Sequence, residues 1–193
     1  MSLVDGFDSL RLFLLAGLVA HKVLWEAMKR GSRPPARRNT GILLQGVKIA
    51  KALFLVGLII QTLFLQVLPL SADPALPRLV GSAFFLIGLA TAMSGRVQLG
   101  RNWKDVEDIA TARQESLTTR GIYGYIRHPI YAGDMLLLIG LELALNSWLV
   151  LAMIVPILVF AKQAVAEESL LAGKFQGYSS YAARTKRFIP FLI

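Results

Sequence analysis

Two uncharged apolar runs constrain the fold of this chain more than any other feature. Ala52–Leu68 and Leu79–Gly95 are each 17 residues long and contain no charged side chain. A helix needs about 20 mostly apolar residues to cross the roughly 30 Å of hydrocarbon in a bilayer. With 55% hydrophobic and 17% charged residues, the chain is also too apolar for a disordered protein or an ordinary soluble domain. These runs predict an integral membrane protein.

Two further segments complete the predicted set of spans. Phe7–Met28 is apolar, and its charges lie mainly near its ends, where long basic side chains can reach the headgroups. Pro129–Ala166 has 38 residues, too many for one crossing, with Asn146 and Ser147 near its middle. The predicted fold is therefore all-α with five transmembrane helices, of which the fourth and fifth form a helical hairpin. We expect one domain, 1–193, made of three N-terminal spans (1–95) and a loop, hairpin and tail (96–193).

The net charge of +9, from 21 Lys and Arg against 12 Asp and Glu, agrees with this topology. The basic residues cluster between spans one and two, between spans three and four, and after span five. Because cytoplasmic segments carry the excess of Lys and Arg, we expect an outside N-terminus and a cytoplasmic C-terminus. Clusters such as Arg33, Arg37 and Arg38 would hold anionic lipid headgroups, so no nucleic-acid partner is needed to explain the charge.

The lack of cysteine and the scarcity of histidine exclude several kinds of site. No Cys is present, which excludes disulfides, thiolate nucleophiles and thiolate metal ligands. The two histidines, His21 and His128, are too few for a multi-histidine metal site. We therefore expect no metal.

Two predicted cytoplasmic segments, Arg96–Arg127 and Ala166–Pro190, flank the hairpin. The stretches from His128 to Asn146 and from Asn146 to Glu167 correspond to helical arms of about 27 and about 32 Å. An antiparallel hairpin would then bring an imidazole, a phenol and two carboxylates to nearly the same depth, namely His128, Tyr131, Glu167 and Glu168. As ordinary solvated residues, the two glutamates would instead pair with a nearby cation such as Arg127.

The sequence around these residues resembles a known family. RHPIYAG at Arg127–Gly133 is followed by EE at Glu167 and Glu168 and then by F…GY..Y…R..R.IP. This pattern is similar to that of the isoprenylcysteine carboxyl methyltransferases, which belong with phospholipid N-methyltransferases in a wider group of membrane methyltransferases. The resemblance extends over Gln98–Pro190, and the N-terminal spans match only in being hydrophobic.

The resemblance implies S-adenosylmethionine as methyl donor and a role for each part of the site. The implied catalytic residues are His128, Tyr131, Glu167 and Glu168. Gln163 and Glu167 would contact the acceptor, and eukaryotic members carry an arginine at the position of Gln163. The donor pocket would be formed by Glu115, Ser116, Leu117, Thr118, Tyr123, His128, Pro129, Ile130 and Tyr131.

The expected function is methyl transfer to the carboxylate of a C-terminal isoprenylcysteine, or a similar amphiphile, that enters a cytoplasmic site of a monomer from the bilayer. A carboxylate is already anionic at neutral pH, so positioning supplies most of the catalysis. The first alternative is a phospholipid amine N-methyltransferase, in which Glu167 would act as a base or bind a cation. The second is a non-catalytic transporter or scaffold, suggested by Asp134 and Glu142 inside span four, although either could pair with Lys48 or Lys51.

Overall fold

The computed structural model describes residues 9–29, 42–102 and 116–190. Apart from two isolated β-bridges, these ranges contain no strand, which confirms the all-helical prediction for the described part of the chain. The α-helices are α1 (Ser9–Lys29), α2 (Ile42–Phe64), α3 (Ala75–Leu99), α4 (Pro129–Ala144), α5 (Ile154–Lys174) and α6 (Tyr178–Arg184). Short 3-10 helices lie at η1 (Gly100–Asn102), η3 (Gly121–Gly124) and η4 (Trp148–Met153).

Three helical segments are long and apolar enough to cross a membrane, namely Gln45–Phe64, Ala75–Leu99 and Trp148–Lys174. The other two predicted spans are less clear-cut. α1 carries four charged side chains, and α4 has 16 residues, which is about 24 Å of helix. The count of five spans and the orientation therefore remain predictions. The basic cluster at Arg33, Arg37 and Arg38 lies outside the described residues.

The helix that contains the second predicted span begins and ends earlier in the chain than the apolar run does. The apolar run is Ala52–Leu68, whereas α2 is Ile42–Phe64. The helix extends back beyond the run because the lysines of its first turns lie on the exposed surface. At the other end, the guanidinium of Arg11 donates hydrogen bonds to the carbonyls of Thr62 (2.9 Å) and Gln61 (3.2 Å). A cation that donates hydrogen bonds to the last carbonyls of a helix satisfies these groups and stabilises the C-terminal end of the helix.

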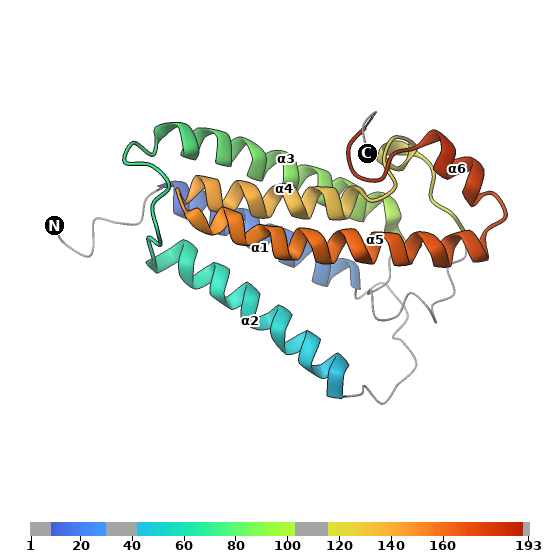
Figure 1. The fold of residues 1–193 in the computed structure, drawn as a ribbon, viewed down its shortest axis with the longest axis horizontal. Coiled ribbons are helices and arrows are strands. Elements are labelled where there is room, and N and C mark those ends of the chain that lie inside the picture. Colours follow the sequence, from blue (N-terminus) through green and yellow to red (C-terminus); the bar gives the residue numbers. More distant parts are fainter. Residues whose placement is uncertain (1–8, 30–41, 103–115, 191–193) are drawn as a thin grey trace.

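α3 and α4 run side by side with their backbones in close contact (Figure 1). Glycine recurs every seven residues on the facing surfaces, at Gly81, Gly88 and Gly95 of α3 and at Gly133 and Gly140 of α4. A side chain at Gly88 would overlap the backbone of Leu137, and one at Gly133 would overlap the backbone of Ala92. Small residues at such spacing let membrane helices approach closely. This interface therefore positions the start of α4 against the end of α3.

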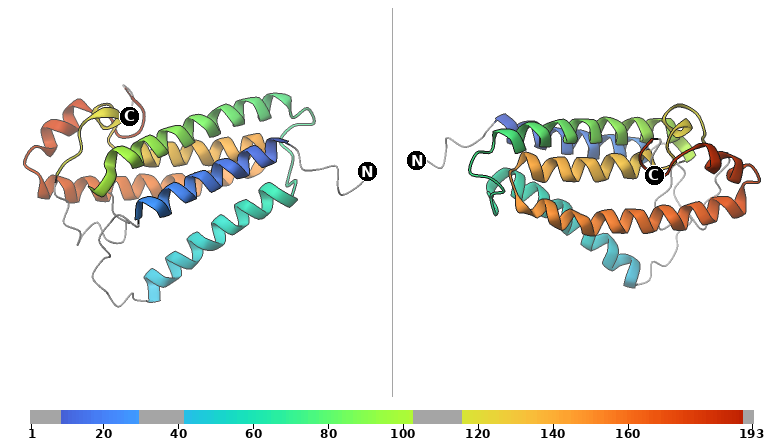
Figure 2. Two further views of the ribbon diagram at one scale, coloured as in Figure 1. Left: turned by 180° about the vertical axis from the view of Figure 1, so that it is seen from behind. Right: turned by 45° about the horizontal axis from the view of Figure 1, so that its top comes forward.

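α1 packs against the α3–α4 pair and completes the hydrophobic core, which includes Leu14, Leu18, Phe85, Leu137 and Leu141. α2 joins this core through Leu58, in its C-terminal half. Toward its N-terminal end α2 diverges from the other helices, as both the front and the rear views show (Figure 1 and Figure 2). α2 is therefore held mainly at the end that carries the Arg11 contacts.

The predicted hairpin turn at Asn146 and Ser147 is confirmed. Asn146 has a φ of 54°, a left-handed conformation that asparagine adopts more readily than most residues. Its side-chain amide donates to the carbonyl of Ser71 (2.8 Å) and accepts from the Ser71 N–H (3.0 Å). The hairpin returns α5 along α4, so the beginning of α4 and the C-terminal half of α5 lie toward one end of the molecule (Figure 1).

The two acidic side chains within α4 pair with other helices. Asp134 Oδ1 lies 3.0 Å from His21 Nε2 of α1, and the amide of Gln61 on α2 donates to Glu142 Oε2 at 2.8 Å. The suggested pairing with Lys48 or Lys51 is therefore replaced by these two contacts, because the lysines lie on the exposed surface of α2. The same contacts give a structural role to the residues that had favoured a transporter.

Candidate active site

The Arg127–Gly133 motif lies where the chain enters α4. Pro129 is the first helical residue, a position where its missing N–H has no intrahelical partner and its fixed φ suits the helix. His128 precedes it as the N-cap and is 6% exposed. The C-terminal tail runs beside both, because Arg127 N donates to the carbonyl of Lys186 (2.7 Å) and His128 N to that of Arg187 (3.0 Å). Motif and tail therefore form one backbone unit.

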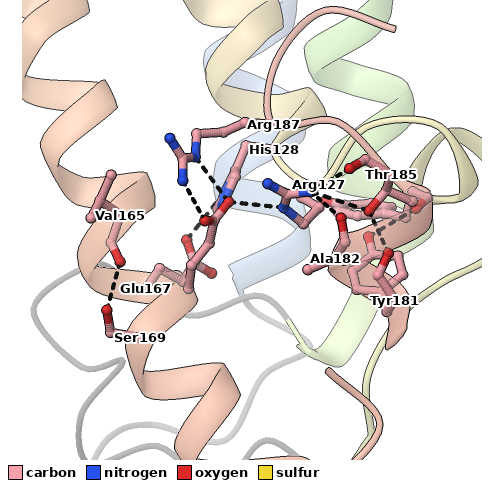
Figure 3. A network of polar contacts seen from close by, with 11 residues as sticks. Arg127, His128, Val165, Glu167, Ser169, Tyr181, Ala182, Thr185 and Arg187 are labelled. Atoms are coloured by element: carbon pink, nitrogen blue, oxygen red, sulfur yellow. Dashed lines mark hydrogen bonds and ion pairs between the residues drawn. The ribbon is translucent and has the colours of Figure 1, made fainter. Parts of the chain in front are cut away.

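Three nitrogen-bearing side chains converge on the carboxylate of Glu168. These three, Arg127, His128 and Arg187, are labelled in Figure 3. Oε1 accepts from Arg127 Nε (2.9 Å) and Arg187 Nε (3.0 Å) and lies 3.1 Å from His128 Nε2. Oε2 accepts from Arg187 Nη2 at 2.7 Å. Charge-assisted bonds of this kind are the stronger ones in proteins, and the hydrogen bond to Glu168 raises the pKa of Arg187. Glu168 therefore fixes the tail to the motif.

Arg127 extends this network to α6. Its Nη1 donates to the carbonyls of Ala182 (2.9 Å) and Thr185. The Thr185 hydroxyl in turn donates to the carbonyl of Tyr181 at 2.8 Å. The C-terminal end of α6 is thereby held against the beginning of α4.

Glu167 has a different environment from its neighbour. Its Oε2 lies 3.7 Å from His128 Nδ1, and its carboxyl lies close to the phenol of Tyr131. The Tyr131 ring stacks on Phe160 at 5.6 Å and on the His128 imidazole at 5.5 Å between centroids. A carboxylate bordered by aromatic faces is a favourable environment for a cationic ligand group. The two glutamates therefore differ: Glu168 holds the tail, and Glu167 lies beside the rings of His128 and Tyr131.

Two buried phenols connect η3 to α6 and α3. Tyr123 donates to the carbonyl of Gly95 (3.3 Å), and Tyr181 donates to the carbonyl of Tyr123 (2.8 Å). Burial raises the pKa of both phenols, that of Tyr181 to about 12, so both remain protonated donors. The ring of Tyr178 packs edge-on against Tyr181 at 6.0 Å.

The predicted donor segment lies next to the end of α3. The amide of Asn102 donates to the hydroxyls of Ser116 (3.2 Å) and Thr118 (3.1 Å). The N–H of Ile122 donates to the side chain of Gln98 (2.8 Å), which brings η3 against α3. Leu117, between these two hydroxyls in sequence, is half-buried. Glu115 lies outside the described residues.

The structure brings together the four side chains predicted to be catalytic, His128, Tyr131, Glu167 and Glu168. Pro129 and Ile130 begin α4 beside Gly95. Gln163 is half-buried on α5, one helical turn before Glu167. The sequence reasoning missed Arg187, although the second arginine of the R..R.IP pattern was a signal for it. The residues that the structure describes contain no group of three His, Cys, Asp or Glu side chains that could hold a metal ion.

Comparisons of sequence agree with this geometry. The family model described as phospholipid methyltransferase matches residues 76–177, just over half of the chain. The protein-S-isoprenylcysteine O-methyltransferase of Schizosaccharomyces pombe is 26% identical over 112 residues, covering 56% of this chain and 48% of that protein. The cobalt-zinc-cadmium resistance protein CzcN of Cupriavidus metallidurans is 32% identical over 94 residues, covering 48% of this chain and 43% of that protein. The chain thus spans about half the length of these curated relatives.

The fold is shared with a solved structure. The eukaryotic intramembrane Ras methyltransferase, an isoprenylcysteine carboxyl methyltransferase, superposes with a TM-score of 0.57 at 22% identity. The match covers 94% of this chain and 63% of that protein. Together with the three helices of membrane-spanning length, these likenesses identify the chain as an integral membrane protein.

Proposed function

This chain belongs to the phospholipid methyltransferase family, and from that membership we propose that it transfers a methyl group from S-adenosylmethionine to an amphiphilic acceptor. The observation that carries the proposal is the convergence of His128, Tyr131 and Glu167, where the RHP motif begins α4 and the EE pair lies near the end of α5. The names of the isoprenylcysteine methyltransferase relative and of the solved structure support it.

The residues around this convergence suit a ligand that carries a sulfonium, an ammonium and a carboxylate. Glu167 and the rings of Tyr131 and His128 would attract the two cationic groups. The first N–H groups of α4 would favour the carboxylate, because helix N-termini bind anions. Ser116 and Thr118, held by Asn102, would complete the pocket. When bound, the donor supplies an activated methyl group, and the residues of this chain bind and orient it.

We propose the carboxylate of a C-terminal isoprenylcysteine, or a similar amphiphile, as the acceptor. Such a carboxylate is deprotonated at neutral pH, so the protein needs to supply orientation rather than a general base. The lipid tail would remain in the bilayer between helices. Gln163, one turn before Glu167 on α5, would offer amide hydrogens to the acceptor carboxylate.

For the membrane topology we propose five spans, with α1 and α4 crossing beside the three longer helices. The active site and the C-terminus would face the cytoplasm, because the end of the bundle that carries Arg127, Lys186 and Arg187 holds more basic residues than the turns at the other end. We propose further that 1–193 acts as one methyltransferase domain and as a monomer.

A second candidate function is methylation of a phospholipid amine. Two observations favour it, namely the family match itself and the neutral Gln163 beside the site, since an uncharged amine needs no cationic partner. An amine must lose a proton to react, and Glu167 would then act as the general base.

The deciding experiment uses the purified full chain in lipid nanodiscs with a methyl-labelled donor. Label recovered in a base-labile ester of a prenylcysteine supports the first acceptor, and label in the amine of phosphatidylethanolamine supports the second. Binding of S-adenosylhomocysteine is measured in parallel by calorimetry. A folded protein that binds no S-adenosylhomocysteine overturns the proposed methyltransferase activity.

A further inference from the structure

The hydroxyl of Tyr178 differs from the other buried phenols. Tyr178 is 5% exposed, and its Oη has no hydrogen-bond partner among the residues that the structure describes. Tyr123 and Tyr181, by contrast, each donate to a backbone carbonyl. Burying an unsatisfied hydroxyl costs free energy, and native proteins leave few such groups without a reason. The Tyr178 hydroxyl therefore requires an explanation.

The position of Tyr178 supplies one. It is the first residue of α6, and its ring lies edge-on against that of Tyr181 in the same helix. Burial raises the pKa of the Tyr178 phenol, and the nearby carboxylates of Glu168 and Glu167 raise it too, whereas Arg127 lowers it. The phenol thus stays protonated, as a donor, beside the candidate active site.

The two carboxylates near Tyr178 interact with other side chains and accept no hydrogen bond from its hydroxyl. The oxygens of Glu168 already accept from Arg127 and Arg187. Glu167 lies close to the Tyr131 phenol and 3.7 Å from His128 Nδ1. A buried hydrogen-bond donor that has no partner in the surrounding network is the kind of group that a binding site provides for its ligand.

We propose that Tyr178 is a donor-binding residue whose phenol donates a hydrogen bond to a polar acceptor atom of the bound S-adenosyl ligand. This inference rests on the proposed function, because that function supplies the ligand. It also assigns Tyr178 and Tyr181, neighbours on one short helix, to different tasks. Tyr181 ties α6 to η3, and Tyr178 contacts the ligand.

The test compares Tyr178→Phe with Tyr181→Phe in the full chain, because each change removes one hydroxyl from the same helix. Melting temperature is measured without ligand, and S-adenosylhomocysteine affinity is measured by calorimetry. Tyr178→Phe is expected to melt at or above the wild-type temperature, because it removes an unsatisfied group. It should weaken S-adenosylhomocysteine binding about three- to tenfold, the size of one net hydrogen bond. Tyr181→Phe should lower the melting temperature, because it leaves the Tyr123 carbonyl without its donor.

Each other outcome has a distinct meaning. Unchanged affinity in Tyr178→Phe overturns the inference and leaves the proposed function intact. A lower melting temperature of ligand-free Tyr178→Phe also overturns it, because the hydroxyl would then have a partner within the protein. A folded wild-type protein that does not bind S-adenosylhomocysteine overturns the proposed function, and this inference falls with it.

Discussion

His128 Nε2 lies 3.1 Å from Glu168 Oε1, although the two residues are 40 positions apart in the chain. The same oxygen accepts from Arg127 and Arg187, whereas Glu167 meets the other imidazole nitrogen at 3.7 Å. One histidine is therefore placed between two adjacent carboxylates with different surroundings. The difference predicts that the two glutamates respond differently to the same substitution.

Glu168→Gln should lower the free energy of unfolding by about 2–4 kcal/mol, because it removes the charge that two arginines and His128 share. Glu167→Gln should keep the melting temperature close to that of the wild type but lower methyl transfer at least tenfold, because it neutralises the carboxylate beside the proposed donor site. Thermal unfolding and initial rates measured on both variants check this. Equal loss of stability in the two variants would contradict the assigned difference.

Arg187 should stabilise the protein through the bidentate geometry of its guanidinium as well as through its charge. Arg187→Lys keeps the charge but cannot make the paired Nε and Nη2 contacts to Glu168, so the melting temperature should fall by several degrees. Arg184→Lys is the matched control, since Arg184 Nε donates to the Ser180 carbonyl within its own helix. A double-mutant cycle with Glu168→Gln should give a coupling energy of about 1 kcal/mol or more. Additive effects would show that the pair is not coupled.

The close α3–α4 contact predicts opposite effects at two glycines of neighbouring helices. Gly88→Ala should destabilise the protein by about 1–3 kcal/mol, because the new methyl group meets the backbone of Leu137. Gly57→Ala on α2 meets nothing within 4 Å and should be neutral or stabilising, since alanine favours helix over glycine. Comparative melting of the two variants in one detergent is sufficient. A neutral Gly88→Ala would refute the close packing.

The His21–Asp134 pair should stabilise the contact between α1 and α4. Asp134→Asn should cost about 1 kcal/mol of unfolding free energy, because it removes the charged partner of a half-buried imidazole. Lys22→Ala serves as the control, because Lys22 pairs with Glu26 on the exposed surface of the same helix, where such pairs contribute about 0.3–0.5 kcal/mol. A larger loss in Lys22→Ala than in Asp134→Asn would go against this assignment.

Gln163 offers a test of the acceptor. Gln163→Arg places a cation one turn before Glu167 and should lower the KM for a prenylcysteine carboxylate by about threefold or more. The same change should raise the KM for a lipid amine, which its charge would repel when the amine is protonated. Steady-state kinetics with both acceptors distinguish the cases. No change with either acceptor would place Gln163 away from the acceptor.

Much of the architecture follows from local rules. Most of each apolar run is helical, because a segment in hydrocarbon must satisfy its backbone hydrogen bonds internally. The turn at Asn146 lies where polar residues divide a segment too long for one span. The approach of His128 to the glutamates follows from the constant rise of a helix, because two arms of similar length return to the same level. The boundaries of α2 were less predictable, because the contacts that end it come from Arg11, 51 residues away from Thr62.

The sequence by itself determined the helical class, the hairpin and the group of residues that meets at the beginning of α4. Only the tertiary structure decided what each of these residues does. Neighbours such as Glu167 and Glu168 point about 100° apart around a helix, so the rotation of α5 and the path of the tail select which carboxylate meets the arginines. That selection depends on Arg187 and on the backbone bonds that carry it to His128, contacts between segments that no local pattern encodes.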